Sequence, residues 1–170
     1  MEKWVYRGQY IQVSELEYQN QIWEKAHFRG GVIIYPITDD NQLILIKEFR
    51  PHETPQVRLK PVTGIYEEEF SWQENANREL QEEIGLKAHQ LELILETRQS
   101  GSINGFQKYV MAKNLEPSKL ENPDGEESIQ EIIHIPLKKL EEKIYKQEIP
   151  WSHSILGMFL LLRRSELFLS

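Results

Sequence analysis

Three glutamates lie close together in the segment NRELQEEIGL, residues 77–86. Glu79, Glu82 and Glu83 recur at spacings of three and four, so a helix would place them on one face. Like charges at i and i+4 destabilise a bare helix by about 0.2–0.5 kcal/mol, and the C-terminal end of a helix also disfavours anions. A divalent cation bound to this face would turn the repulsion into coordination, because Mg²⁺ prefers oxygen ligands. The alternative is a solvated acidic face, which is the usual role of a run of charges.

Local signals predict a helix over residues 72–84 that would carry these carboxylates. Ser71 and Glu74 have the spacing of a capping box, which satisfies free backbone amides at a helix start. Gly85 is placed to end the helix in the left-handed conformation. Apolar residues at every fourth position form a stripe that should face the core: Trp72, Ala76, Leu80 and Ile84.

The rest of the chain shows strand patterns followed by late helices. Residues 3–28 are rich in Tyr, Trp, Val and Ile, as in strands joined by short turns. The segment GGVIIYPITDDNQLILIKEF, residues 30–49, predicts a β-hairpin around the turn DDNQ. Further strands are expected at 91–98, 106–115 and 131–137, and helices at about 137–146 and 152–168. This order predicts an α+β fold in which helices pack on a mixed sheet.

Composition limits the class of protein. The chain of 170 residues suits one domain with a sizeable core, and the absence of cysteine excludes disulfides and thiolate metal sites. The N-terminus has no apolar signal segment, and the longest apolar run, residues 155–162, is too short to span a bilayer. A cytoplasmic protein without a membrane partner is expected. The net charge of −7 argues against a broad nucleic-acid surface, although a bound cation would still permit phosphate substrates.

The segment from Gly64 to Leu86, GIYEEEFSWQENANRELQEEIGL, resembles the sequence motif of the Nudix hydrolases. That motif has a Gly, five residues, a Glu, seven residues, and then Arg-Glu-aliphatic-x-Glu-Glu-x-Gly-aliphatic. The similarity covers roughly residues 28–165 and points to the ADP-ribose and nucleotide-sugar pyrophosphatases. It implies an α/β/α sandwich with a mixed sheet at residues 29–170, preceded by antiparallel strands at residues 1–28. The matching positions are Gly64, Arg78, Glu79, Leu80, Glu82, Glu83, Gly85 and Leu86.

One position departs from the family motif. The first Glu of the pattern falls on Phe70, next to Glu69. In the family this Glu supports the motif, commonly by pairing with the Arg, which is Arg78 here; Arg78 and Gly85 are expected to be structural. A one-residue bulge would let Glu69 reach Arg78. The favoured interpretation is that Phe70 packs in the core and that Arg78 finds another carboxylate.

The resemblance implies hydrolysis of a nucleoside diphosphate linked to another moiety, such as a nucleotide sugar or an ADP-ribose-like compound, by attack of water on phosphorus. It makes Glu79 and Glu83 the principal ligands of Mg²⁺ or Mn²⁺. Glu82 would be a further ligand or would orient the attacking water. The backbone carbonyl of Thr63 or Gly64 would complete the site. A cation held there neutralises phosphate charge and lowers the pKa of bound water.

Further candidates lie outside the motif. The acidic loop NPDGEES, residues 122–128, corresponds to a loop from which related enzymes take a base or another ligand. Glu126 and Glu127 are therefore candidates, and an ordinary exposed turn is the alternative. Arg50 matches an arginine of the relatives and could bind a phosphate or form a surface ion pair.

Two short segments differ from the related enzymes. Those enzymes read ELPAG into the motif, whereas this chain reads KPVTG. Lys60 thus stands in place of an acid, where it would suit a more anionic substrate or be an ordinary surface lysine. The relatives also carry Ser-Pro-Gly after the next strand. The segment QSGSING, residues 99–105, lacks that proline, which argues against ADP-ribose itself as the substrate.

The resemblance also bears on assembly and on alternative functions. Residues 1–28 would build a homodimer and its substrate pocket, as the corresponding strands do in the related enzymes. Their aromatic side chains, Trp4, Tyr6, Tyr10 and Trp23, could stack on a base or pack at the interface. A nucleotide-binding Nudix domain without turnover is the main alternative, favoured by the departures at residues 60 and 70. An RNA-end hydrolase is disfavoured by the net charge of −7.

Overall fold

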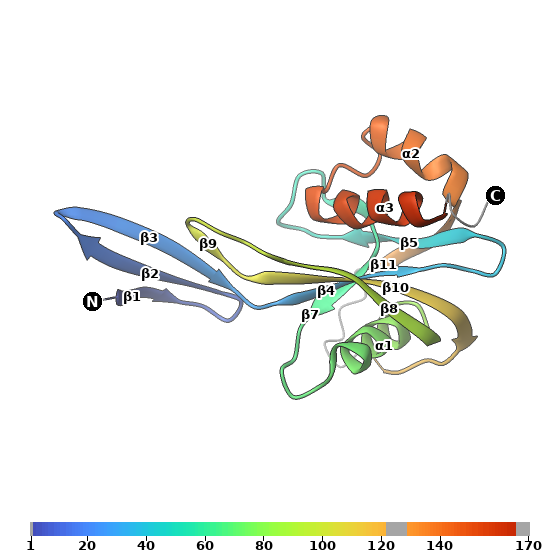
Figure 1. Cartoon of the computed structure of the whole chain (residues 1–170), viewed down its shortest axis with the longest axis horizontal. Coiled ribbons are helices and arrows are strands. Elements are labelled where there is room, and N and C mark those ends of the chain that lie inside the picture. Colours follow the sequence, from blue (N-terminus) through green and yellow to red (C-terminus); the bar gives the residue numbers. More distant parts are fainter. Residues whose placement is uncertain (1, 122–128, 166–170) are drawn as a thin grey trace.

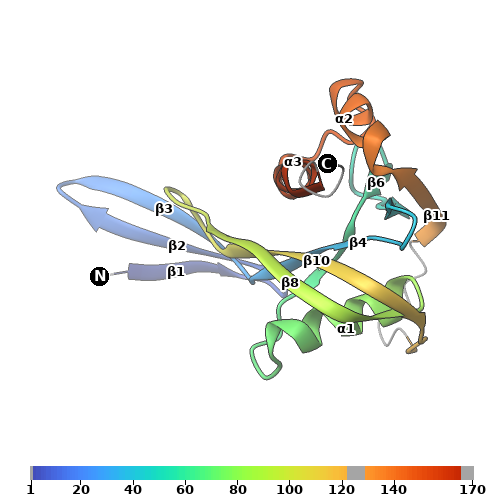
Figure 2. The ribbon, with the colours of Figure 1, turned by 45° about the vertical axis from the view of Figure 1, so that its right-hand side comes forward.

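Helices cover both faces of a central mixed sheet (Figures 1 and 2). The computed structural model of the protein describes residues 2–121 and 129–165. The central sheet has the strand order β7-β4-β10-β8, in which β4 (Gly31–Pro36) and β10 (Phe106–Pro117) run parallel. β7 (Val62–Ile65) and β8 (Leu86–Arg98) run antiparallel to their neighbours. α1 (Trp72–Glu83) lies on one side, and α2 (Leu137–Tyr145) and α3 (Ser152–Ser165) lie on the other. The predicted α+β fold is confirmed.

β4 is buried along its whole length and separates two hydrophobic clusters. Alternate residues of a strand point to opposite faces, so a strand between two helical layers needs a continuous apolar run. Val32 and Ile34 pack in the cluster that contains Ala76 and Leu80 of α1. The intervening side chains, Ile33 and Tyr35, pack in the cluster that contains residues of α2 and α3. One apolar segment of the sequence therefore anchors both layers.

The predicted hairpin at residues 30–49 is wrong, because its two strands belong to different sheets. β5 (Gln42–Phe49) pairs with β11 (Ile129–Pro136) and β6 (Val57–Lys60) in a three-stranded antiparallel sheet. Between β4 and β5, backbone pairing of the described residues is limited to an isolated bridge that joins Ile37 to Leu43. Both edges of β4 are already taken by β7 and β10, so β5 turns away after residue 41.

α1 begins at the predicted residue and ends at Glu83, one residue before the predicted end, with Ile84 as its C-cap. The hydroxyl of Ser71 accepts from the amide of Glu74, and the carboxylate of Glu74 accepts from the amide of Ser71, which completes the capping box. Gly85 has a φ of 68°, the left-handed conformation in which glycine carries no steric cost. The late helices are confirmed as α2 and α3. Among the helices within the described residues, none combines the length and apolar character needed to cross a membrane.

The N-terminal strands form a separate sheet that extends away from the helical layers (Figure 1). β1 (Glu2–Arg7), β2 (Ile11–Tyr18) and β3 (Gln21–Phe28) are antiparallel, and the short β9 (Ile103–Asn104) pairs with β3. Among the described residues of β1, β2 and β3, only Ser14 is buried. Its hydroxyl bonds to the Glu2 carboxylate at 2.6 Å and to His27 Nε2 at 2.8 Å. This sheet therefore has no apolar core of its own.

Candidate active site

α1 and β7 bring four of the predicted metal-site residues together. The carboxylate of Glu79 lies directly over Gly64: a Cβ at position 64 would come within 1.7 Å of Glu79 Oε1. Position 64 must therefore be glycine for the carboxylate to lie there. The backbone amide of Thr63 donates to Glu83 Oε2 at 3.3 Å. The motif thus connects the strand before the helix to the acidic face of the helix.

Burial and mutual repulsion act on these carboxylates. Burial, followed by the charges of Glu83 and Glu82, raises the pKa of Glu79 from an ordinary 4.5 to about 8. Burial also raises the pKa of Glu83, although the neighbouring Lys60 ammonium and the Thr63 amide counteract it. Two carboxylates that resist ionisation side by side are a place where a cation would be stabilising.

The donor set fits a hard divalent cation in its chemistry. It offers carboxylate oxygens from α1 next to the backbone of β7, and Mg²⁺ and Mn²⁺ favour oxygen ligands. Within residues 2–121 and 129–165, however, no group of three or more His, Asp or Glu side chains is arranged so that it could hold a metal ion. Cations of the protein itself hold two of the glutamates: Arg78 lies 3.6 Å from Glu82, and Lys60 lies 3.6 Å from Glu83.

A buried glutamate that the sequence analysis missed lies next to this site. Glu48, on β5, has a side chain that is 2% exposed. Its carboxylate contacts Arg50 at 2.7 Å, Arg58 at 2.9 Å and Lys60 at 3.3 Å. Burial alone would raise the pKa of Glu48, but the hydrogen bond from Arg50 and the three positive charges lower it to about 2. A glutamate near the end of the apolar run LILIKEF was the sequence signal that could have revealed it.

The strand register explains how this charged cluster forms. In the antiparallel pair of β5 and β6, Glu48 lies opposite Arg58, and Ile46 lies opposite Lys60. Directly opposed residues share a face, so Glu48, Arg58 and Lys60 point to the same side of the sheet. Arg50 follows β5 immediately and is 35% exposed. Lys60 is not a surface lysine, because its side chain is 4% exposed.

Arg78 finds a carboxylate that neither sequence interpretation named. Its guanidinium bonds to Glu67 Oε2 at 2.5 Å and lies 4.5 Å from the ring centre of Phe70. Phe70 is half-buried and belongs to neither core cluster, so the expectation that it packs in the core is wrong. Asn75 shapes this loop: its side chain accepts from the amide of Glu67 and donates to the carbonyls of Glu67, Phe70 and Ser71. The loop thus turns Glu67 toward Arg78 in place of the missing motif carboxylate.

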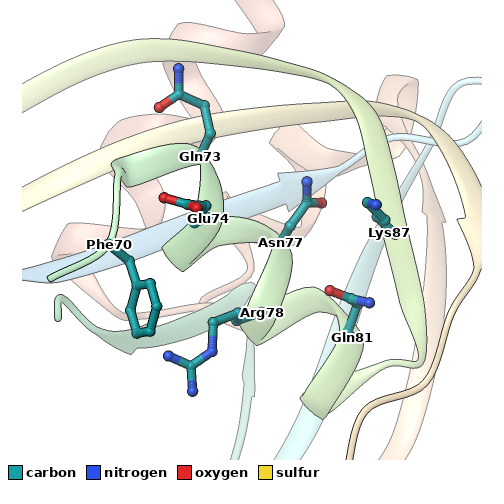
Figure 3. Close-up of a pocket in the computed structure, with 7 residues that line it drawn as sticks. All are labelled: Phe70, Gln73, Glu74, Asn77, Arg78, Gln81 and Lys87. Carbon is teal, nitrogen blue, oxygen red and sulfur yellow. The ribbon is translucent and has the colours of Figure 1, made fainter.

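Phe70 and Arg78 line an open groove of about 350 Å³ along α1. Figure 3 shows the Phe70 ring beside the Arg78 side chain. The other side chains that line the groove are Gln73, Glu74, Asn77, Gln81 and Lys87. Helical spacing places the lining residues of α1 on a different face from Glu79 and Glu83, and Lys87 lies on β8, so this groove is not the predicted metal site. Glu126 and Glu127, the candidates in the acidic loop, lie outside the described residues.

Comparisons with known proteins agree with the motif. The model of the NUDIX domain matches residues 27–154. ADP compounds hydrolase NudE of Escherichia coli (strain K12) is 28% identical over 157 residues, which are 89% of this chain and 82% of that protein. A crystal structure of an ADP compounds hydrolase superposes with a TM-score of 0.83 at 25% identity, over 98% of this chain and 92% of the other. The chain therefore belongs to the Nudix family, and it is a Nudix hydrolase that acts on phosphoric anhydride bonds.

Proposed function

We propose that the protein is a metal-dependent pyrophosphohydrolase of ADP-linked compounds, such as nucleotide sugars and ADP-ribose-like molecules. Water would attack one phosphorus of the diphosphate, the bridging P–O bond would break, and two phosphate monoesters would form. The observation that carries the proposal is the pair of carboxylates, Glu79 and Glu83, held against β7 by Gly64 and the Thr63 amide. The names of the similar proteins support the choice of ADP-linked substrates.

The residues of α1 and β7 would hold Mg²⁺ or Mn²⁺. Glu79 and Glu83 are the proposed principal ligands, with Glu82 and a backbone carbonyl of Thr63 or Gly64 as further donors. When bound, the cation supplies charge neutralisation for the diphosphate and a lower pKa for the attacking water. The proton of that water needs an acceptor, and Glu82, Glu126 and Glu127 are the proposed candidates.

The substrate phosphates need a positive partner outside the metal site. Arg50 is the proposed one, because it is partly exposed and its guanidinium is held in place by Glu48 at 2.7 Å. A guanidinium fixed on one side by a buried carboxylate loses little further side-chain entropy when it binds a phosphate. Lys60 was the second sequence candidate for this role, but its side chain is only 4% exposed and contacts the same Glu48 oxygen as Arg50.

A panel of diphosphates tests the proposal. ADP-ribose, ADP-sugars, NADH and dinucleoside polyphosphates are each incubated with Mg²⁺ or Mn²⁺, and release of phosphate monoester is measured. At least one ADP-linked compound should be hydrolysed only with the cation. Glu83→Gln should lower kcat by about 10²–10³ with a smaller change in KM, because the group acts mainly in the transition state.

Glu69→Gln is the matched control, since Glu69 is an exposed carboxylate in the loop before α1. It should leave kcat and KM unchanged. If no compound is turned over, yet nucleotide affinity is measurable and survives Glu83→Gln, the protein is a binding domain and the proposed activity is wrong.

We further propose that the protein is a homodimer, with the N-terminal sheet covered by a second copy of the chain. Among the described residues, more than half of the exposed large hydrophobic side chains lie within residues 4–28. The most exposed side chains among those in residues 4–28 are Tyr6, Tyr10, Tyr18, Ile22 and Trp23. A sheet with no buried apolar face of its own is marginal in water, so a partner surface would stabilise it.

A further inference from the structure

Lys60 is a buried cation inside the proposed metal site. Its ammonium donates to Thr63 Oγ1 at 2.7 Å, and it lies 3.3 Å from Glu48 Oε1 and 3.6 Å from Glu83 Oε1. Its side chain is 4% exposed, as expected only for a lysine whose charge is paired. Lys60 therefore connects Glu48, which holds the arginines, to Glu83, which is a proposed metal ligand.

The Lys60 ammonium lies between two carboxylates, those of Glu48 and Glu83. Glu48 also contacts the guanidinium groups of Arg50 and Arg58, so three cations surround this one carboxylate. Glu53, at 3.0 Å from Arg58, balances one of the two excess charges. Glu83, at 3.6 Å from Lys60, adds a negative charge on the other side of the ammonium. A second cation at Glu83 would be repelled by this ammonium.

We propose that Lys60 is an internal cation that competes with the divalent ion for Glu83 and thereby sets the affinity of the metal site. This inference rests on the proposed function, because it assumes that Glu79 and Glu83 bind the ion. Without metal, Lys60 neutralises Glu83 and holds the empty site together. With metal, the ammonium stays buried at Glu48 and Thr63 and weakens binding by electrostatic repulsion. Lys60 is a positioning residue that makes the enzyme dependent on a high concentration of the ion.

Binding of Mn²⁺ to the whole protein without substrate tests the proposal. Free Mn²⁺ is measured by electron paramagnetic resonance during titration of the wild type and of Lys60→Met. The methionine keeps the unbranched shape and removes the charge, so its Kd for Mn²⁺ should fall by about 10- to 1000-fold. Lys60→Arg keeps the cation and should remain within a few-fold of the wild type.

Two further variants make the experiment decisive. Lys60→Gln keeps a donor for the Thr63 hydroxyl, and it replaces Lys60→Met if that variant does not fold. Lys47→Met is the control, because Lys47 lies on the neighbouring strand with a 41% exposed side chain paired to Glu131 at 2.6 Å. It makes the same charge change on the opposite face of the strand pair, and its Kd should equal that of the wild type.

A second measurement separates competition from simple support of the fold. The metal-free Lys60→Gln protein should melt at a lower temperature than the wild type, and Mn²⁺ should raise its Tm by more than it raises that of the wild type. An unchanged or weaker Mn²⁺ affinity in both neutral variants would overturn the role of Lys60 while leaving the metal site intact. If the wild type and all variants fail to bind Mn²⁺, the proposed metal-dependent function fails, and this inference fails with it.

Discussion

Replacing Glu79 by glutamine removes a carboxylate that the folded protein keeps in an unfavourable place. Burial and the charges of Glu83 and Glu82 raise its pKa from 4.5 to about 8. Because the folded pKa lies above the unfolded one, the folded state binds this proton more tightly. Its contribution to stability is fully present below about pH 4.5 and is lost as the pH rises through 8. Metal-free wild-type protein should therefore become less stable over this range.

The pKa difference sets the size of the effect. At about 1.4 kcal/mol for each tenfold change in the proton equilibrium, a rise from 4.5 to about 8 corresponds to at most about 5 kcal/mol. Glutamine has nearly the same shape and no proton to lose. The free energy of unfolding of Glu79→Gln should therefore be close to that of the wild type near pH 5 and exceed it by a few kcal/mol at pH 8.

Urea denaturation with a chelator present, followed by the fluorescence of the four tryptophans, measures this difference at each pH from 5 to 9. Glu69→Gln makes the same change at an exposed position and should follow the wild type at every pH. Saturating Mg²⁺ should stabilise the wild type at pH 8 and have little effect on Glu79→Gln. A constant difference between Glu79→Gln and wild type from pH 5 to 9 would falsify the electrostatic account of the site.

Three more substitutions probe the site and the assembly. Gly64→Ala places a Cβ within 1.7 Å of Glu79 Oε1, so the carboxylate must move. We expect the stability to fall by about 1–3 kcal/mol and the metal-induced rise in Tm to disappear. An unchanged Tm response to metal would contradict this expectation. Glu48→Gln removes the buried carboxylate that contacts Arg50, Arg58 and Lys60, and it should cost about 3–5 kcal/mol in urea denaturation. A neutral effect would show that the cluster is dispensable. Trp23→Glu puts a charge on the exposed N-terminal sheet and should convert the proposed dimer to a monomer of 20.2 kDa by light scattering. A wild-type monomer at micromolar concentration would refute the proposed homodimer.

The sequence alone was sufficient to predict α1, the helix that carries the proposed metal ligands. The Ser71 cap, the stripe ending at Ile84 and the left-handed Gly85 are all confirmed. These features depend on interactions within about four residues along the chain, so their spacing can be read directly. The same periodicity places Glu79 and Glu83 on one face of α1. The fold class followed from the order of such elements and from the motif.

Only the tertiary structure decided which strands pair and which charges are buried. β4 and β5 look like a hairpin in sequence, but β4 is paired on both edges by β7 and β10, which lie about 30 and 75 residues further along the chain. Glu67 forms the ion pair with Arg78 because Asn75 fixes the intervening loop, and the spacing of the motif does not predict that contact. Lys60 looks like a surface lysine until the register of β5 and β6 places it beside Glu48, and the position of α1 adds Glu83. A strand partner and a buried counter-charge come from distant segments, and their approach depends on how the whole core packs.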